Sequence, residues 1–191
     1  MNQQELLAKF EELGVLLNGH FKLTSGLHSK QYMQCAKLFE CPKQAGEVLK
    51  HLITHLPEGI ETVIAPAIGG VTVGYEIARQ LGCRFVFAER QDGKMTFRRG
   101  FQLTPGEKVI AVEDVITTGG SVKEVIDLAK ESGAEVLGVA TVVDRSQGKA
   151  DFDMPLTSLI TMEIEVFEPE SCPLCAEGME IQSPGSRQQT K

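Results

Sequence analysis

The stretch from Lys108 to Leu128 constrains the fold of this chain more than any other. It opens with an apolar run, Val109 to Val112, that follows a Pro-Gly turn and is typical of a strand buried on both faces. Apolar residues then recur at helical spacing, at Val122, Val125, Ile126 and Ala129. A strand, a short loop and a helix in this order predict a βα unit of an α/β domain.

Two acids and a loop rich in hydroxyls and glycines separate this strand from its helix. The acids are Glu113 and Asp114, and after two apolar residues, Val115 and Ile116, the loop reads Thr117, Thr118, Gly119, Gly120 and Ser121. Glycines let backbone N–H groups converge, and a helix N-terminus adds the positive end of its dipole, so the loop is expected to hold a phosphate. Neither a Walker loop nor a dinucleotide fingerprint fits the spacing.

The two acids indicate what else the ligand carries. Carboxylates repel phosphate, so Glu113 and Asp114 are expected to face sugar hydroxyls or a magnesium ion on the same ligand, and a phosphorylated sugar satisfies both halves of the site. The alternative is an ordinary βα turn, in which Gly119 and Gly120 only allow close packing. Two acids beside three hydroxyls argue against that alternative.

Composition narrows the class of protein. A chain of 191 residues is long enough for one domain with a real core. A net charge of −7 argues against a nucleic-acid surface, no run approaches the roughly 20 apolar residues of a membrane span, and the N-terminus lacks a secretory signal. Five scattered cysteines fit a reducing compartment. We therefore expect a cytoplasmic α/β protein that binds neither nucleic acid nor membrane.

Periodicity and turn residues predict the remaining elements. Helices are expected over residues 2–13 and 41–56 and from Val73 to Leu81. Strands are expected as a hairpin within 15–36 that turns at Ser25-Gly26, and at 61–66, 83–88, 135–143 and 157–166. From Ser183 to Lys191 the composition predicts a disordered tail.

Val112 to Gly120 resembles the signature of type I phosphoribosyltransferases, which bind 5-phosphoribosyl 1-diphosphate. The resemblance implies that family's fold, a central mainly parallel sheet flanked by helices, with an N-terminal hood hairpin and a flexible basic loop. It implies a domain over residues 1–170 whose hood covers about 1–40, followed by a Cys-x-x-Cys segment and tail at 171–191. Glu113 and Asp114 would be catalytic, and 113–121 would bind the donor.

A second segment resembles one branch of that family. Gly19-x-Phe21-x-Leu-Thr-Ser-Gly, followed by Ser-x-x-Tyr32, is similar to the N-terminal hairpin of orotate phosphoribosyltransferases. The resemblance implies an orotate site formed by Thr117, Arg145, Thr24, Ser25, Tyr32 and Met33, with Arg145 pairing with the carboxylate or ring oxygens of orotate. The alternatives are a solvent-exposed hairpin and, for Arg145, a surface ion pair.

The turn at Gly69-Gly70 ends another buried strand and could offer backbone N–H groups to a diphosphate. In the resembling family this turn usually reads Pro-Ala-Tyr-Lys-Gly, and its lysine contacts the diphosphate. Gly69 stands in place of that lysine, as in a bacterial branch with Pro-Ala-Ile-Gly-Gly. The sequence leaves open what takes over the role of the lysine.

Four cations gather around the turn at Asp92-Gly93 in an otherwise acidic chain; they are Arg90, Lys94, Arg98 and Arg99. A leaving pyrophosphate needs several donors together, and arginine binds phosphate bidentately. The resemblance implies that this loop is catalytic and reaches the neighbouring subunit of a homodimer. The alternative is a solvated charged loop.

Metal-binding patterns are sparse. Mg²⁺ is expected as cofactor through the diphosphate and ribose hydroxyls, with no dedicated protein ligand. Cys172 and Cys175 form a Cys-x-x-Cys pair, which is half of a zinc site or a redox couple, but no second pair exists, so a complete site would need distant ligands. His51 and His55 have a helical i, i+4 spacing and are expected to be solvated.

These features together predict an orotate phosphoribosyltransferase, which makes orotidine 5′-monophosphate and pyrophosphate in pyrimidine biosynthesis. Two alternatives remain at this stage. The first is a phosphoribosyltransferase for a purine or other base, because the central loop is shared across the superfamily. The second is a regulator that binds the donor without catalysis; such a protein would usually carry a basic DNA-binding segment, which this acidic chain lacks.

Overall fold

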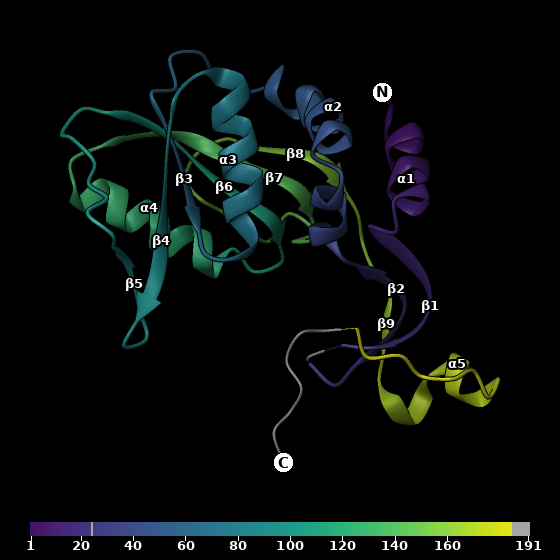
Figure 1. The fold of residues 1–191 in the computed structure, drawn as a ribbon. Coiled ribbons are helices and arrows are strands. Elements are labelled where there is room, and N and C mark those ends of the chain that lie inside the picture. The colour runs from purple at the N-terminus through teal and green to yellow at the C-terminus, as the bar shows by residue number, and fades with distance from the viewer. Residues whose placement is uncertain (24, 185–191) are drawn as a thin grey trace.

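The computed structural model describes residues 1–23 and 25–184, which form a large and a small β-sheet with helices (Figure 1). The large sheet has the strand order β5-β4-β3-β6-β7-β8. Its strands are β3 (Thr62–Pro66), β4 (Arg84–Gln91), β5 (Lys94–Phe97), β6 (Lys108–Ile116), β7 (Glu135–Asp144) and β8 (Leu156–Thr161). All neighbours in this sheet pair in parallel except β4 and β5, which form an antiparallel hairpin.

Helices cover both faces of the large sheet (Figure 1). On one face, α2 (Pro42–Ile53) and α3 (Gly69–Leu81) share a hydrophobic cluster with α1 (Gln3–Glu12). On the other face, α4 (Gly120–Glu131) packs in a second cluster that includes Ile64, Ala111 and Val139 of the sheet. Because helices cover both faces, every residue of β3 is buried, and β6 is buried from Val109 to Val112.

The chain reverses its direction of winding between β3 and β6. After β3 it runs through α3 to β4 on one side, and after β6 it runs through α4 to β7 on the other. Open α/β sheets bind ligands at the carboxyl ends of their strands at such a switch point. The Gly69-Gly70 turn follows β3, and Glu113 and Asp114 lie near the carboxyl end of β6, so both groups lie at the switch point.

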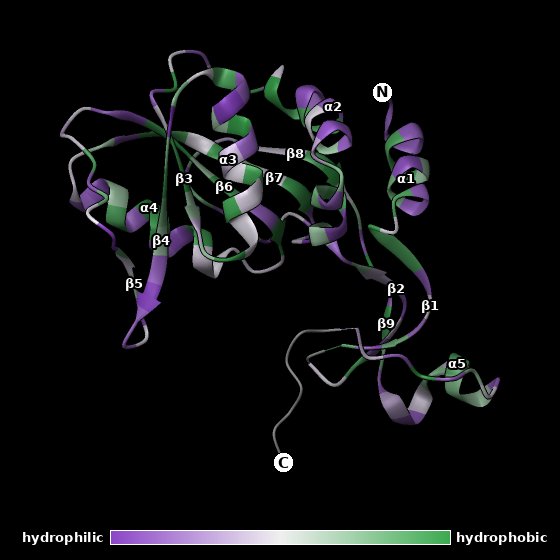
Figure 2. Cartoon of the chain, in the orientation of Figure 1, coloured by the Kyte–Doolittle hydropathy of each residue, from purple (hydrophilic) through white to green (hydrophobic). Residues whose placement is uncertain are grey.

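The small sheet is antiparallel and stands apart from the large one (Figure 1). Its order is β1-β2-β9, and its strands are β1 (Leu16–Lys22), β2 (His28–Met33) and β9 (Val166–Phe167). The C-terminal segment continues beside this sheet through η2 (Pro169–Ser171) and α5 (Pro173–Ala176). The hydropathy colouring shows apolar central strands in the large sheet, whereas the end of the β4–β5 hairpin is hydrophilic (Figure 2).

The structure confirms the expected α/β class with a mainly parallel sheet flanked by helices, and it confirms the N-terminal hairpin. One expected strand is wrong: residues 157–166 do not form a single strand, because β8 ends at Thr161 and Val166 begins β9 in the other sheet. The periodicity also missed the 3-10 helix η1 (Cys35–Glu40). The tail predicted from Ser183 lies almost wholly outside the described residues. Across residues 1–23 and 25–184, no helix is long and apolar enough to cross a membrane.

Candidate active site

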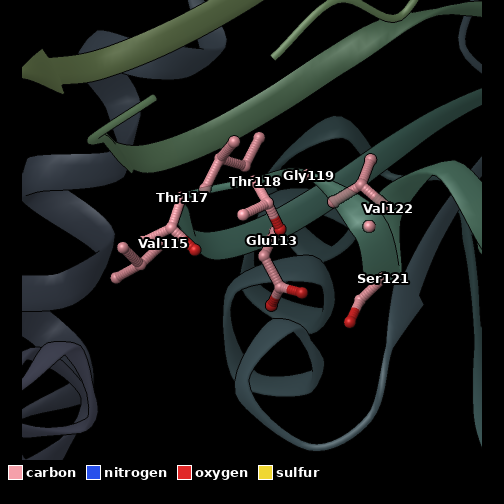
Figure 3. Close-up of a pocket in the computed structure, with 9 residues that line it drawn as sticks. Glu113, Val115, Thr117, Thr118, Gly119, Ser121 and Val122 are labelled. Carbon is pink, nitrogen blue, oxygen red and sulfur yellow. The ribbon is translucent and has the colours of Figure 1, made fainter. Parts of the chain in front are cut away.

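The loop between β6 and α4 lines a pocket of about 270 Å³ that opens to solvent. The lining runs from Glu113 and Val115 to Val122, and the Glu113 carboxylate and Ser121 hydroxyl point to the same side (Figure 3). The α4 N-terminus has no side-chain cap, which leaves its first backbone N–H groups available to an anion. The pocket therefore has the donors that the sequence predicted for a phosphate.

Gly119 shows why this loop needs glycine. Its φ of 76° lies in the left-handed region, and a Cβ atom there would come within 2.7 Å of the Phe152 ring. Phe152 is buried in the same cluster as α4. The ring thus supports the loop from behind, and only a residue without a side chain lets the loop pass over it.

Glu113 and Asp114 lie near the end of β6 and are both partly buried. Val115 N–H donates to Asp114 Oδ1 at 2.8 Å, and Asp114 N–H donates to Glu113 Oε1 at 3.1 Å. Burial, with a smaller contribution from the Asp114 charge, raises the pKa of Glu113 to about 8. Neither acid pairs with a lysine or arginine in the part of the chain that the structure describes. Among the described residues, no basic side chain therefore neutralises the charge of this acid pair.

The Gly69-Gly70 turn lies directly against the two acids. A Cβ atom on Gly69 would come within 2.7 Å of Asp114 Oδ1, and one on Gly70 would come within 3.2 Å of Glu113 Oε1 and 2.9 Å of the Val112 carbonyl oxygen. Asp114 thus occupies the space that a side chain at position 69 would take. A lysine at position 69 would therefore have to displace Asp114, and α3 begins at Gly69, beside these carboxylates.

A second group of side chains gathers around Arg145, which follows β7. Its Nε is buried and has no hydrogen-bond partner among the residues described. Burial lowers the pKa of Arg145, an effect that the nearby Cys35 and Tyr32 partly offset. Burial likewise raises the pKa of the Tyr32 hydroxyl, and Arg145 opposes that rise. A half-buried guanidinium without an anion is an expected site for a carboxylate ligand.

Cys35 lies near both groups of side chains and was not among the residues expected at the site. Burial first, and then the Asp114 carboxylate, raise the pKa of its thiol, while Arg145 lowers it. This buried thiol therefore lies close enough to the acids and to the arginine for their charges to shift its pKa. Its place in η1, a short helix without a periodic pattern, explains why sequence reasoning passed over it.

The expected orotate residues of the N-terminal hairpin do not all meet at Arg145. Tyr32 lies near it, whereas Met33 is 7% exposed and packs in the larger hydrophobic cluster. Ser25 is exposed at the hairpin tip, where its hydroxyl accepts from Leu27 N–H at 3.4 Å. Seven residues of extended chain correspond to roughly 20 Å, so the tip is distant from Tyr32 in this conformation. Thr24 lies outside the described residues.

The basic segment forms the β4–β5 hairpin, which turns at Asp92-Gly93 and extends past the carboxyl edge of β3. All four of its cations are exposed. Arg90 donates to Glu124 Oε2 of α4 at 2.8 Å, and Arg99 donates to Glu89 Oε2 at 2.8 Å. Lys94 and Arg98 have no side-chain hydrogen bond or ion pair within the described ranges.

Comparison with known proteins agrees with this fold. The phosphoribosyl transferase domain family matches residues 37–173, which defines the protein as a phosphoribosyltransferase. An orotate phosphoribosyltransferase of Caldicellulosiruptor bescii is 54% identical over 98% of this chain and 99% of its own length. One of Chlorobium phaeobacteroides is 53% identical over 98% and 97%. The chain belongs to the orotate phosphoribosyltransferase family.

Solved structures show the same fold at low identity. The orotate phosphoribosyltransferase of Aeropyrum pernix has a TM-score of 0.68 at 24% identity and covers 82% of this chain and 93% of its own. An adenine phosphoribosyltransferase of Thermoanaerobacter pseudethanolicus has a TM-score of 0.61 at 18% identity and covers 69% and 88%. These likenesses concern the fold, which members with different bases share.

Proposed function

We propose that this chain transfers ribose 5-phosphate from 5-phosphoribosyl 1-diphosphate to orotate, giving orotidine 5′-monophosphate and pyrophosphate in pyrimidine (UMP) biosynthesis. The observation that carries the proposal is the acid pair Glu113 and Asp114, which lies between the Gly69-Gly70 turn and the phosphate loop at the switch point. Family membership supports orotate as the base.

The donor's 5′-phosphate binds the loop from Thr117 to Ser121, where N–H groups and hydroxyls supply hydrogen bonds. Its ribose hydroxyls bind Glu113 and Asp114. As the bond from C1 to the diphosphate breaks, the ribose gains positive charge, and the two acids stabilise it in their ionised forms. Binding energy from the remote phosphate holds the reacting carbon in place.

The residues present fit a Mg²⁺ ion brought in by the donor. Two partly buried carboxylates that have no basic partner among the residues described favour a nearby cation, and oxygen ligands are those that Mg²⁺ prefers. The ion would be held mainly by the diphosphate and ribose hydroxyls, close to Glu113 and Asp114. When bound, Mg²⁺ neutralises charge that develops on the diphosphate.

Orotate binds between Arg145, Tyr32 and Thr117. The Arg145 guanidinium pairs with its carboxylate, which gives the orphaned Nε a partner. Thr24, Ser25 and Met33 remain part of the proposal through the hairpin that carries them. For Ser25 this requires the hairpin tip to move toward the site, since the tip is distant from Tyr32 in the conformation described.

The leaving pyrophosphate is met by backbone N–H groups of Gly69 and Gly70 and by the cations of the β4–β5 hairpin. Lys94 and Arg98 are free for this task, whereas Arg90 and Arg99 must first leave Glu124 and Glu89. We place the hairpin in the site of a second subunit of a homodimer, because it projects past the edge of its own sheet. Closure of the hairpin excludes water from the reacting ribose.

Mixing two inactive variants tests the shared hairpin. A subunit with Asp114→Asn and a subunit with Lys94→Ala and Arg98→Ala each spoil a different half of every site. If the hairpin acts in the partner's site, mixed dimers contain one intact site and regain activity. No recovery in a mixture shown to exchange subunits would place the hairpin in its own subunit's site.

Two broader assignments complete the proposal. The domain spans 1–170 with a hood over about 1–40, and 171–191 form a separate segment. We also propose a cytoplasmic location, with no nucleic-acid or membrane partner, which the five free cysteines and the charge of −7 support.

Steady-state assays with orotate, adenine and hypoxanthine test the reaction itself. We expect pyrophosphate release with orotate and none with the purines. Turnover with a purine alone would favour the wider phosphoribosyltransferase class, and donor binding without turnover of any base would favour a regulator.

A further inference from the structure

Four side chains with nitrogen and sulfur ligand atoms meet beside the small sheet, away from the candidate active site. They are His20 of β1, His28 of β2, Cys172 just before α5 and Cys175 within α5. One ligand atom from each lies within 4.8 Å of all the others. The Cys-x-x-Cys pair, which had no partners in sequence, thus gains two histidines from a hairpin about 150 residues away.

The distances match those of a tetrahedral site. Ligand bonds of about 2.0–2.1 Å to nitrogen and 2.3 Å to sulfur give separations of roughly 3.3 Å for nitrogen pairs and 3.6 Å for nitrogen–sulfur pairs. Here His20 Nε2 and His28 Nδ1 are 3.0 Å apart. Sγ of Cys172 lies 3.6 Å from His20 Nε2, and Sγ of Cys175 lies 3.7 Å from it and 3.3 Å from His28 Nδ1.

A hydrogen bond prepares His20 as a ligand. Its Nδ1 lies 2.9 Å from the Met179 carbonyl oxygen, which can only accept, so Nδ1 carries the proton. In the neutral ring, Nε2 then presents a lone pair to the cluster. Metal-binding histidines are usually oriented in this way by a carbonyl or carboxylate behind the ring.

We infer that His20, His28, Cys172 and Cys175 bind one Zn²⁺ ion that fastens the C-terminal segment to the small sheet. Two thiols and two imidazoles are a donor set that favours zinc, and all four positions are filled by protein, as in structural sites. Binding displaces the two thiol protons, and the thiolates supply the negative charge.

Beyond β9, which pairs with β2, the described C-terminal segment has few apolar contacts to hold it. No residue after Ile164 belongs to either hydrophobic cluster of the described chain, and α5 has four residues, too few for a stable isolated helix. Backbone hydrogen bonds join Gln182 to His20 and Lys22, next to the cluster. A metal would therefore add a link through four side chains between the segment after β9 and β1–β2 (Figure 1).

Metal binding by the full reduced chain tests the inference. After chelator treatment, Zn²⁺ titration against a chromophoric chelator is expected to show one tight site per chain. Co²⁺ in its place is expected to give the visible bands of a tetrahedral ion with a thiolate charge-transfer band. Absence of stoichiometric uptake, or an octahedral Co²⁺ spectrum without thiolate bands, would overturn the inference.

Cys175→Ser, at the most accessible of the four positions, is expected to weaken Zn²⁺ binding by more than the roughly 10- to 100-fold that loss of a partner behind a ligand costs. Cys41→Ser, an exposed thiol outside the cluster, is the matched control and is expected to bind as the wild type does. Equal binding by both variants would contradict the assignment; should Cys175→Ser not fold, the wild-type Co²⁺ spectrum decides.

Hydrogen exchange tests the structural role. Amides of residues 172–182 are expected to exchange more slowly with Zn²⁺ than after chelation, with those of the large sheet unchanged. Equal exchange in both states would refute the fastening role.

Discussion

Gly69→Ala is a single-methyl test of the contact between the Gly69-Gly70 turn and the acids. The added Cβ would lie 2.7 Å from Asp114 Oδ1 and 2.9 Å from both Cγ and Oδ2. Because all three carboxylate atoms are that close, turning the carboxylate about its own axis gives no relief, and the Asp114 side chain must move. Overpacking of this kind costs about 1–3 kcal/mol of stability.

The displaced carboxylate should lose its hydrogen bonds to the donor's ribose. A hydrogen bond to a charged group contributes about 1.5–3 kcal/mol, which corresponds to a roughly 10- to 150-fold loss in kcat/KM for 5-phosphoribosyl 1-diphosphate. Orotate binding at Arg145 should change much less. Initial rates with each substrate varied in turn measure both effects, and urea unfolding measures the stability.

Gly46→Ala is the matched control. A Cβ there would lie 2.8 Å from Glu76 Oε1, a similar clash with a carboxylate, but between α2 and α3 and outside the site. It should lower stability and leave kcat/KM for the donor unchanged. Wild-type kcat/KM in a folded Gly69→Ala variant, or an equal loss in both variants, would refute the role of Asp114.

Further predictions concern the other groups of the site. Asp114→Asn should lower kcat by at least about 100-fold with the fold intact, since it removes charge stabilisation of the ribose. Arg145→Gln should raise KM for orotate about 10- to 100-fold and leave KM for the donor alone. Lys94→Ala with Arg98→Ala should lower kcat in both directions and weaken pyrophosphate binding. The stability of Glu113→Gln relative to wild type should be greater at pH 9 than at pH 5. The pKa of Glu113 is about 8 in the folded protein and ordinarily 4.5, so wild type loses stability as the pH rises from 4.5 to 8. The loss is at most about 1.4 kcal/mol per pH unit.

Specific outcomes would contradict each of these. Full activity of Asp114→Asn would remove this acid from the site, and an unchanged KM for orotate in Arg145→Gln would leave Arg145 without its carboxylate. Unaltered pyrophosphate kinetics in the Lys94 and Arg98 double variant would make the hairpin a solvated charged loop. For Glu113→Gln, a stability difference from wild type that is the same at pH 5 and pH 9 in urea unfolding would show that Glu113 titrates normally.

Much of this architecture could be predicted from local patterns. The apolar run before Glu113 and the glycines after it are contiguous, so periodicity and turn chemistry were enough to place the β6–α4 unit. The strand expected over 157–166 failed because apolar residues continue past Thr161 while the chain passes to the other sheet. A sequence pattern reports that a segment is apolar, but not which sheet accepts it.

The parts that could not be predicted depend on contacts between distant segments. Cys35 lies near Asp114 and Arg145 only once η1 packs beside the sheet, and the contact of Asp114 with Gly69 forms only where the start of α3 meets β6. His20 and His28 have no metal-binding pattern in the sequence around them. Only the fold of the C-terminal segment brings Cys172 and Cys175 to them.

A crystal structure with 5-phosphoribosyl 1-diphosphate and Mg²⁺ would show whether the donor binds at the β6–α4 loop. We expect 5′-phosphate oxygens about 3 Å from backbone N–H groups between Thr117 and Ser121, and ribose hydroxyls at a similar distance from Glu113 and Asp114. A donor bound elsewhere, with that loop empty and both acids turned to solvent, would contradict it.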